Sequence, residues 1–253
     1  MIEVSATLAN RVGTVRFDRP PVNVLSIAML EEAQAQVDDL LKRGAEVIVL
    51  RTAGERAFSA GVDVADHVPE RVPRMLAALH GLLEKLWDSR AVSLAVVQGA
   101  ARGGGAELAL GCDLVVAAAE ATFGFPEIQV GCFPPVAVAL LPARLGAQVA
   151  TDLVLTGRVL SAEEALRAEL VNRLADPGDL EAAVDQVLGA LLSRSGAVRA
   201  IALERVRAAW VPEARRLLRE AELAYTGRLL ATRDVVEGVS AFLEKRPPVW
   251  SGA

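Results

Sequence analysis

Three segments of the chain carry residues that could do chemistry: AFSAGVD at 57–63, ARGGGAELALGCDLVV at 101–116 and ATFGFPEIQVG at 121–131. A single glutamate stands in the apolar part of each of the last two, Glu107 and Glu127. Burial of a carboxyl group is costly unless it has a partner or a role. Two carboxyl groups that converge on an apolar pocket can act as a general acid and a general base. Each glutamate alone also fits the first turn of a helix, where the dipole favours a negative charge.

Small residues in the same segments would leave main-chain amides open to a ligand. Gly103–Gly105 stand between a predicted strand at 94–99 and a predicted helix. Glycine allows close approach of the backbone, and the first N–H groups of a helix have no partner within it. Such groups can receive a negative oxygen. Ser59–Gly61 follow another predicted strand, 46–51, and could aim a second amide at the same oxygen. Each stretch alone also fits an ordinary tight turn or loop.

The apolar pattern that must position these segments predicts an α/β core followed by helices. Short apolar strands alternate with amphipathic helices to about residue 175. A helix over 26–44 begins with a Ser26 cap, and Ser161 with Glu164 forms a capping box. Beyond residue 179 the period is helical. We therefore predict an α/β core over 1–195 and a helical section over 196–253, whose apolar faces need a partner in the core or in another subunit.

Composition excludes several classes of function. The chain has 253 residues, of which 53% are hydrophobic, and a net charge of −5 without a basic cluster. We expect no nucleic-acid partner, because phosphate binding needs a concentrated basic face. We expect no membrane partner, because no apolar run reaches the roughly 20 residues that span a bilayer. Cys112, Cys132, His67 and His80 lack the spacing of metal ligands, so we expect no metal site. We see no signal peptide and expect a cytoplasmic protein.

Together the three segments resemble, in order and spacing, the motifs of the enoyl-CoA hydratase/isomerase (crotonase) superfamily. RPPVNVLS at 19–26, LTGRVLSAEEALRAELVNRL at 155–174 and AFLEKRPPVW at 241–250 are similar to further segments of that family. The resemblance implies a spiral of stacked ββα units, with C-terminal helices that build a homotrimer or a dimer of trimers. It also implies an acyl-CoA substrate and no separate cofactor, because coenzyme A is part of the substrate.

The resemblance assigns roles to individual residues. The thioester oxygen would lie between the main-chain N–H groups of Ala60 and Gly104. Glu107 would deprotonate the water that attacks the β carbon, and Glu127 would give a proton to the α carbon. The division of acid and base between the two glutamates is left open. The residues implied in binding CoA and the acyl group are Ala60, Gly61, Val62, Asp63, Gly104, Phe133, Pro135, Phe242 and Lys245.

The presence of both acids implies a hydratase, which adds water reversibly to a C=C bond conjugated with a CoA thioester. The segment CFPPVAVALLP at 132–142 departs from the small residues common in the family. Phe133, Val136 and Val138 predict a bulkier and more rigid wall for the acyl group, and Pro135 stiffens the turn. With RPPVNVLSIAM at 19–29, this variant resembles the cyclohexa-1,5-diene-1-carbonyl-CoA hydratases, which act on a ring diene. The alternative is a general short-chain enoyl-CoA hydratase.

Other functions remain open from the sequence. An enoyl-CoA isomerase or an acyl-CoA thioester hydrolase could use the same fold, and so could a non-catalytic CoA-binding protein. A serine hydrolase would need Ser59 with His67 or His80. The chain has no G-x-S-x-G nucleophile motif, which weakens that reading.

Overall fold

Two sheets, both mostly parallel, form the centre of the molecule. The structure is a computed structural model that describes residues 3–253. One sheet has the order β1-β2-β3-β5-β7-β10 and the other the order β4-β6-β8-β9. Only the β1–β2 and β8–β9 pairs are antiparallel. The strands are β1 (Val4–Ala9), β2 (Val12–Phe17), β3 (Val47–Thr52), β4 (Ala57–Ser59), β5 (Val92–Val97), β6 (Ala100–Arg102), β7 (Leu114–Ala118), β8 (Thr122–Gly124), β9 (Val159–Ser161) and β10 (Arg173–Ala175).

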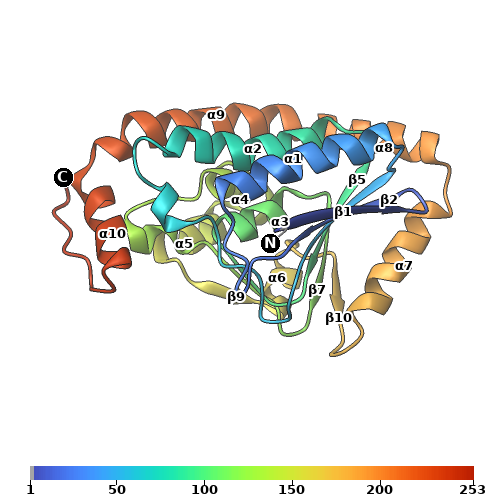
Figure 1. Ribbon diagram of the computed structural model, residues 1–253, viewed down its shortest axis with the longest axis horizontal. Helices are drawn as coiled ribbons and strands as arrows, with labels where there is room; N and C mark the ends of the chain where they lie inside the picture. Colours follow the sequence, from blue (N-terminus) through green and yellow to red (C-terminus); the bar gives the residue numbers. More distant parts are fainter. Residues whose placement is uncertain (1–2) are drawn as a thin grey trace.

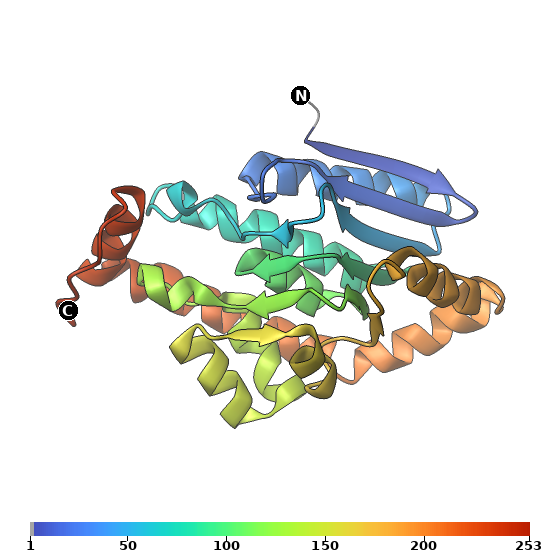
Figure 2. The ribbon, with the colours of Figure 1, turned by 90° about the horizontal axis from the view of Figure 1, so that it is seen from below.

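A ββα unit repeats along the chain and produces the spiral. Each turn gives one strand to the six-stranded sheet, one short strand to the four-stranded sheet and then a helix. The successive units are β3-β4-α2, β5-β6-α3 and β7-β8-α4. In Figure 2 the colours of the strands accordingly follow the sequence across the molecule. The predicted α/β spiral is confirmed.

Helices cover the sheets and extend beyond them at both ends. α1, α2 and α9 lie side by side over the strands, and α7 and α10 lie at opposite ends (Figure 1). The helices are α1 (Ile27–Lys42), α2 (Val72–Asp88), α3 (Gly104–Gly111), α4 (Pro135–Leu145), α5 (Ala147–Thr156), α6 (Ala162–Arg167), α7 (Leu180–Leu192), α8 (Gly196–Ala208), α9 (Val211–Gly227) and α10 (Arg233–Leu243), with 3₁₀ turns η1 (Val64–Asp66), η2 (Pro126–Val130) and η3 (Leu229–Ala231).

Strand alternation divides the core into two layers. Ile48, Leu50 and Ala95 point toward the main core beneath α1, α2 and α3. Their neighbours Val49 and Leu94 point to the opposite face, where Val184 of α7 covers them. Because both faces are buried, β5 is apolar along most of its length rather than alternating. This explains why β3, β5 and β7 could be predicted as short apolar runs.

The predicted helix caps are confirmed, whereas the short strands were not predicted. Ser26 caps α1, and the capping box of Ser161 and Glu164 begins α6, both as predicted. The strands of the four-stranded sheet were missed, because three residues are too few to show a period of two. β10 begins at Arg173, and the apolar Leu170 before it is buried in the turn that follows α6.

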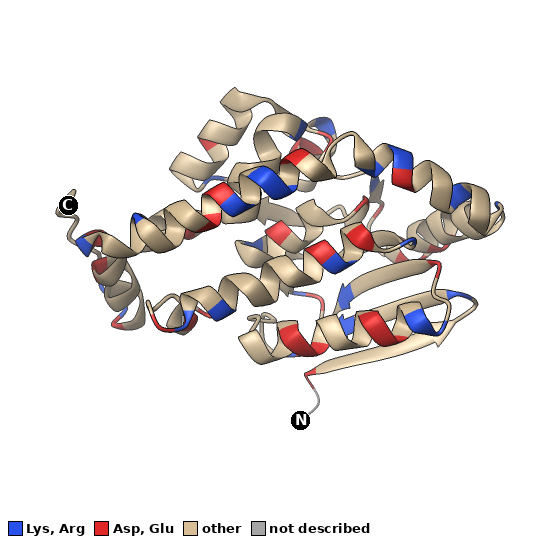
Figure 3. Cartoon of the chain, turned by 90° about the horizontal axis from the view of Figure 1, so that it is seen from above, with Lys and Arg blue, Asp and Glu red and all other residues tan. Residues whose placement is uncertain are grey.

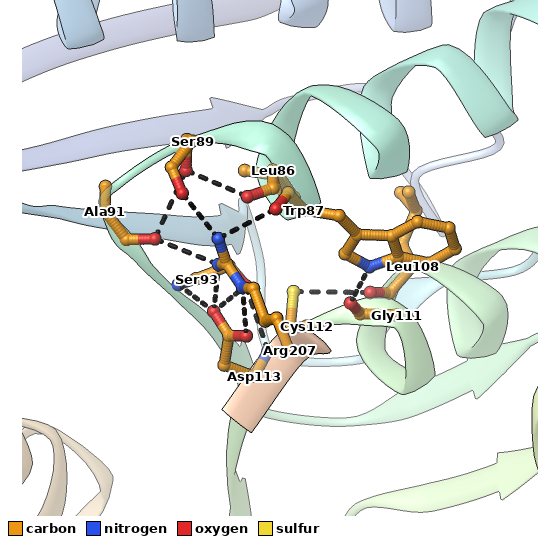
Figure 4. Close-up of polar contacts among 10 residues, drawn as sticks. All are labelled: Leu86, Trp87, Ser89, Ala91, Ser93, Leu108, Gly111, Cys112, Asp113 and Arg207. Atoms are coloured by element: carbon orange, nitrogen blue, oxygen red, sulfur yellow. Dashed lines mark hydrogen bonds and ion pairs between the residues drawn. The ribbon is translucent and has the colours of Figure 1, made fainter. Parts of the chain in front are cut away.

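A buried ion pair fastens α8 to the core (Figure 4). The Arg207 side chain, 4% exposed, donates from Nε and Nη2 to the two carboxylate oxygens of Asp113, at 2.9 and 2.5 Å. It also donates to the carbonyl oxygens of Trp87, Ser89 and Ala91, which lie at the C-terminal end of α2 and just after it. One guanidinium thus satisfies three carbonyls and one carboxylate, so helix α8 is held at a fixed point against β7 and α2.

We predict that Arg207→Met destabilises the fold by about 3–5 kcal/mol, because it leaves the Asp113 carboxylate buried without its partner. Urea unfolding monitored by circular dichroism measures this change. The control is Arg205→Met on the same helix, since Arg205 is exposed and, among residues 3–253, pairs only with Glu204. Equal midpoints for the two variants would contradict the anchoring role of Arg207.

Charges are dispersed over the outer helices. In Figure 3 acidic and basic residues alternate along them, and Arg216 of α9 pairs with Glu213 and Glu220 of its own helix. Within residues 3–253, no helix combines the length and the apolarity that crossing a bilayer requires.

Candidate active site

The three segments singled out in the sequence meet at one cavity of about 410 Å³. The loop after β4, the first turn of α3 and the 3₁₀ turn η2 each form part of its wall. Residues of α2, α9 and α10 complete it, so helices that are far apart in the sequence enclose the cavity. Among the residues that line it are Gly61, Val62, Gly104, Glu107, Glu127, Phe133, Pro135, Tyr225, Phe242 and Arg246.

The three consecutive glycines are explained by what lies against each of them. A Cβ on Gly103 would stand 2.5 Å from Oε1 of Glu127, and Gly103 also has a positive φ of 49°. A Cβ on Gly104 would stand 2.7 Å from a methyl group of Val62. One on Gly105 would meet Ser59 Cβ at 2.5 Å. The segment therefore has no side chains because the carboxyl group of Glu127 and the β4 loop pack directly against its backbone.

The predicted amide donor at Ala60 is wrong. Its N–H already donates to the carbonyl oxygen of Val22, at 2.9 Å. Val62, two residues on, is placed differently, because a parallel bridge pairs it with Leu25. The N–H of Leu25 donates to Gly61 and that of Asp63 to Leu25, so the N–H of Val62 points to the other side of this extended segment. Over residues 3–253 it has no hydrogen-bond acceptor.

The amides of Val62 and Gly104 are close neighbours. A Cβ built on Gly104 lies 3.5 Å from the nitrogen of Val62, and one on Gly61 lies 3.7 Å from the nitrogen of Gly104. Gly104 is the first residue of α3, so its N–H has no acceptor within the helix. Both residues line the cavity. Two open N–H groups side by side can hold one developing oxyanion.

Glu107 is buried in the first turn of α3, with 2% of its surface exposed. Its Oε1 accepts hydrogen bonds from the N–H groups of Val136 and Ala137, at 2.7 and 3.0 Å. These are the first open amides of α4, because Pro135 in the first position has no N–H. Burial raises the pKa of Glu107 above its ordinary value. The neighbouring His80 and the two amides offset part of that rise.

Glu127 lies in η2, where its carboxyl group has fewer hydrogen-bond donors among the described residues than that of Glu107. Its Oε2 is shielded from solvent and has no hydrogen-bond partner within the described chain. Burial, and then the nearby charge of Glu107, raise the pKa of Glu127 well above its ordinary value. The two carboxyl groups therefore interact, and the pair retains a proton above the usual range for carboxylic acids.

Most of the predicted binding residues line the cavity, and two of them lie outside it. Phe133, Pro135 and Phe242 line the cavity, as do Ala60, Gly61, Val62 and Gly104. Val136 is wholly buried behind the wall and donates to Glu107 instead.

Asp63 and Lys245 lie outside the lining of the cavity. The Asp63 carboxylate accepts from the N–H of Ala65 and lies 3.5 Å from Arg19. Lys245 is exposed, and its neighbour Arg246 reaches the cavity while pairing with Glu237. A contact of Lys245 with bound CoA stays a prediction.

Sequence reasoning missed two groups near the acids. Tyr225 of α9 lines the cavity, although its spacing resembles that of a core residue. His80 of α2 is buried, and its Nδ1 is hydrogen-bonded to Glu222 of α9. Both come from helix–helix packing that the sequence pattern does not specify. In hindsight, a lone histidine in the leucine-rich face of α2 was the available signal.

The serine-hydrolase alternative lacks, within residues 3–253, a histidine in contact with the serine. Ser59 Oγ is buried, donates to the carbonyl oxygen of Asn23 and accepts from the N–H of Gly61. Neither His67 nor His80 is bonded to it in the described part of the chain. Burial raises the pKa of the Cys112 thiol to about 12 and that of Cys132 to about 11, so both are protonated at neutral pH.

Comparison with known proteins shows the family of the chain. Residues 7–253 match the family model described as enoyl-CoA hydratase/isomerase. The chain belongs to this family. It is 36% identical to the cyclohexa-1,5-dienecarbonyl-CoA hydratase of Thauera aromatica over 237 residues, which cover 93% of this chain and 91% of that relative.

More distant relatives match over similar lengths. The carnitinyl-CoA dehydratase of Salmonella arizonae is 35% identical, and the match covers 94% of each chain. A solved structure of an enoyl-CoA hydratase from Mycobacterium avium subsp. paratuberculosis K-10 superposes with a TM-score of 0.89 at 28% identity, covering 98% of each chain. The similarity to the family thus extends over nearly the whole chain.

We predict that Glu127→Gln stabilises the fold, increasingly as the pH rises. The unfolded carboxyl titrates near pH ~4.3, and below that value both states hold the proton. At higher pH the unfolded state releases its proton first, because the folded pKa of Glu127 is raised, so wild-type stability falls. The amide has no proton to lose.

Thermal unfolding of both proteins between pH 4 and pH 8 measures the difference, with the exposed Glu120→Gln as the matched control. A difference between wild type and Glu127→Gln that stays constant with pH would show that the carboxyl is not held in its protonated form.

Proposed function

We propose that this protein is an enoyl-CoA hydratase, which adds water reversibly to a C=C bond conjugated with a CoA thioester. The observation that carries the proposal is the placement of two buried carboxyl groups and two open amides around one cavity. A thioester enolate needs charge stabilisation at oxygen and proton transfer at two adjacent carbons. The four groups match those needs in number and kind.

Each of the four groups has one role in the proposed addition of water, and a proton transfer between the two acids then restores them. Glu107 takes a proton from water as the water oxygen bonds to the β carbon. The electron pair of the C=C bond moves toward the thioester oxygen, where the N–H groups of Val62 and Gly104 would stabilise it, and each such donor is worth roughly 3–4 kcal/mol. Glu127 then gives its proton to the α carbon. The proton on Glu107 passes to Glu127 within the coupled pair, which restores the starting state.

The surroundings of the two acids favour this division of roles. Two main-chain donors and His80 stabilise the charged form of Glu107, as suits a base. Oε2 of Glu127 has no partner among the described residues that would stabilise a charge, and burial and Glu107 raise the pKa of Glu127, as suits an acid that holds its proton. We therefore assign Glu107 as the base and Glu127 as the acid.

For the substrate we propose a short or cyclic acyl group, with cyclohexa-1,5-diene-1-carbonyl-CoA as the first candidate. The relative from Thauera aromatica carries that activity in its name. Phe133 and Tyr225 present two rings 5.1 Å apart at the cavity wall, and Pro135 stiffens the segment beside them. A flat ring fits such a rigid wall better than a long flexible chain does.

We further propose a homotrimer or a dimer of trimers that works in the cytoplasm. Exposed apolar side chains on α10 and the tail, including Phe242, Leu243 and Trp250, support an assembly that covers them. Two buried free cysteines fit a reducing compartment.

Steady-state assays of Glu107→Gln and Glu127→Gln test the proposal. Loss of a general acid or base lowers turnover by about 10²- to 10⁴-fold, and we expect this for each variant, whereas Glu120→Gln should match wild type. Crotonyl-CoA and the cyclic dienoyl-CoA are compared in parallel, with the products analysed.

The outcomes separate the alternatives. Near-wild-type turnover in both glutamine variants would remove the hydratase mechanism. A clear preference for crotonyl-CoA would reject the ring substrate alone. A shifted double bond or free CoA as the product would indicate an isomerase or a thioester hydrolase instead.

A further inference from the structure

The single tyrosine of the chain lies beside the two acids. Tyr225 belongs to α9, is 1% exposed and lines the cavity. Its ring packs against Phe133, with centroids 5.1 Å apart and planes inclined by 59°. A residue of the C-terminal helices is thus part of the wall that surrounds the reacting groups.

The hydroxyl of Tyr225 has unused hydrogen-bonding capacity. It is shielded from solvent, and no hydrogen bond to it is found over residues 3–253. The thiol of Cys132 is a neighbour of this hydroxyl, and sulfur is only a weak hydrogen-bonding partner. A buried hydroxyl without a partner is costly and rare in native structures. Phenylalanine would fill the same space without that cost, so the hydroxyl points to a ligand.

The electrostatic surroundings keep this hydroxyl protonated. Burial raises the pKa of Tyr225 far above its ordinary value, and the neighbouring Cys132, Glu127 and Glu107 raise it further. Tyr225 and both acids line the same cavity, so an acyl group bound there would be within the surroundings of all three side chains. The group can therefore donate a hydrogen bond at neutral pH without giving up its proton.

We propose that the hydroxyl of Tyr225 donates a hydrogen bond to the oxygen that adds to the β carbon, first as water and then as the β-hydroxyl of the product. This inference rests on the hydratase function proposed above. As Glu107 removes a proton from the water, its oxygen gains negative charge, and the hydrogen bond from Tyr225 strengthens. In the reverse direction the same bond stabilises the departing hydroxide. Tyr225 keeps its own proton throughout.

The first test is the variant Tyr225→Phe, which retains the ring and its packing against Phe133. We expect kcat to fall roughly 10- to 100-fold in both directions with little change in KM, because the bond is strongest in the transition state. The control is Thr226→Val, which removes the hydroxyl of the next residue on the exposed side of α9. Equal kcat for wild type and Tyr225→Phe would overturn the proposal.

The second test uses the fact that the chain has one tyrosine. Protein labelled with ¹³C at Cζ of tyrosine gives a single resonance, which reports hydrogen bonding of the hydroxyl. We expect it to shift with 3-hydroxybutyryl-CoA and to move much less with butyryl-CoA, which lacks the β oxygen. An identical response to both thioesters, even with a lower kcat, would assign the loss to packing and overturn the hydrogen bond.

The two proposals fail in different ways. If the wild-type enzyme hydrates no enoyl-CoA, the hydratase function fails, whatever Tyr225 does. If the wild-type enzyme is active while Tyr225→Phe retains its kcat, only the role of Tyr225 fails.

Discussion

The site depends on the burial of two carboxyl groups next to each other in an apolar cavity. Each would be costly alone, and together they repel when both are charged. The fold meets this cost unevenly. The first amides of α4 converge on Glu107, whereas Oε2 of Glu127 has no partner within the described residues. This inequality gives two chemically identical side chains different proton affinities, and the difference is what acid–base chemistry on adjacent carbons needs.

Several parts of the fold exist to hold these groups in place. Gly103 has no side chain, so the Glu127 carboxyl can lie against its backbone. Pro135 starts α4 without an N–H and directs the next two amides to Glu107. α9 packs against α2 and α4 and brings Tyr225 to the wall, while Arg207 fastens the neighbouring α8 to the core. The C-terminal helices are therefore part of the site as well as a cover for the sheets.

The sequence indicated the chemistry better than it indicated the geometry. Two lone glutamates in apolar segments and a glycine triplet identified the acids and the open backbone, because burial of charge and loss of side chains are visible residue by residue. The open amide was placed at Ala60 instead of Val62, since the choice depends on a bridge between Leu25 and Val62 that is remote in sequence. Tyr225 was missed for a similar reason: in an amphipathic helix a core tyrosine and a cavity tyrosine have the same spacing.

A structure of the protein with a bound saturated acyl-CoA would show whether the two amides and the two acids act on one substrate. We predict a thioester oxygen about 2.7–3.1 Å from the nitrogens of both Val62 and Gly104. We also predict that the α and β carbons lie between the carboxyl groups of Glu107 and Glu127. A thioester oxygen bound away from these two amides, or acyl carbons out of reach of either acid, would contradict this prediction.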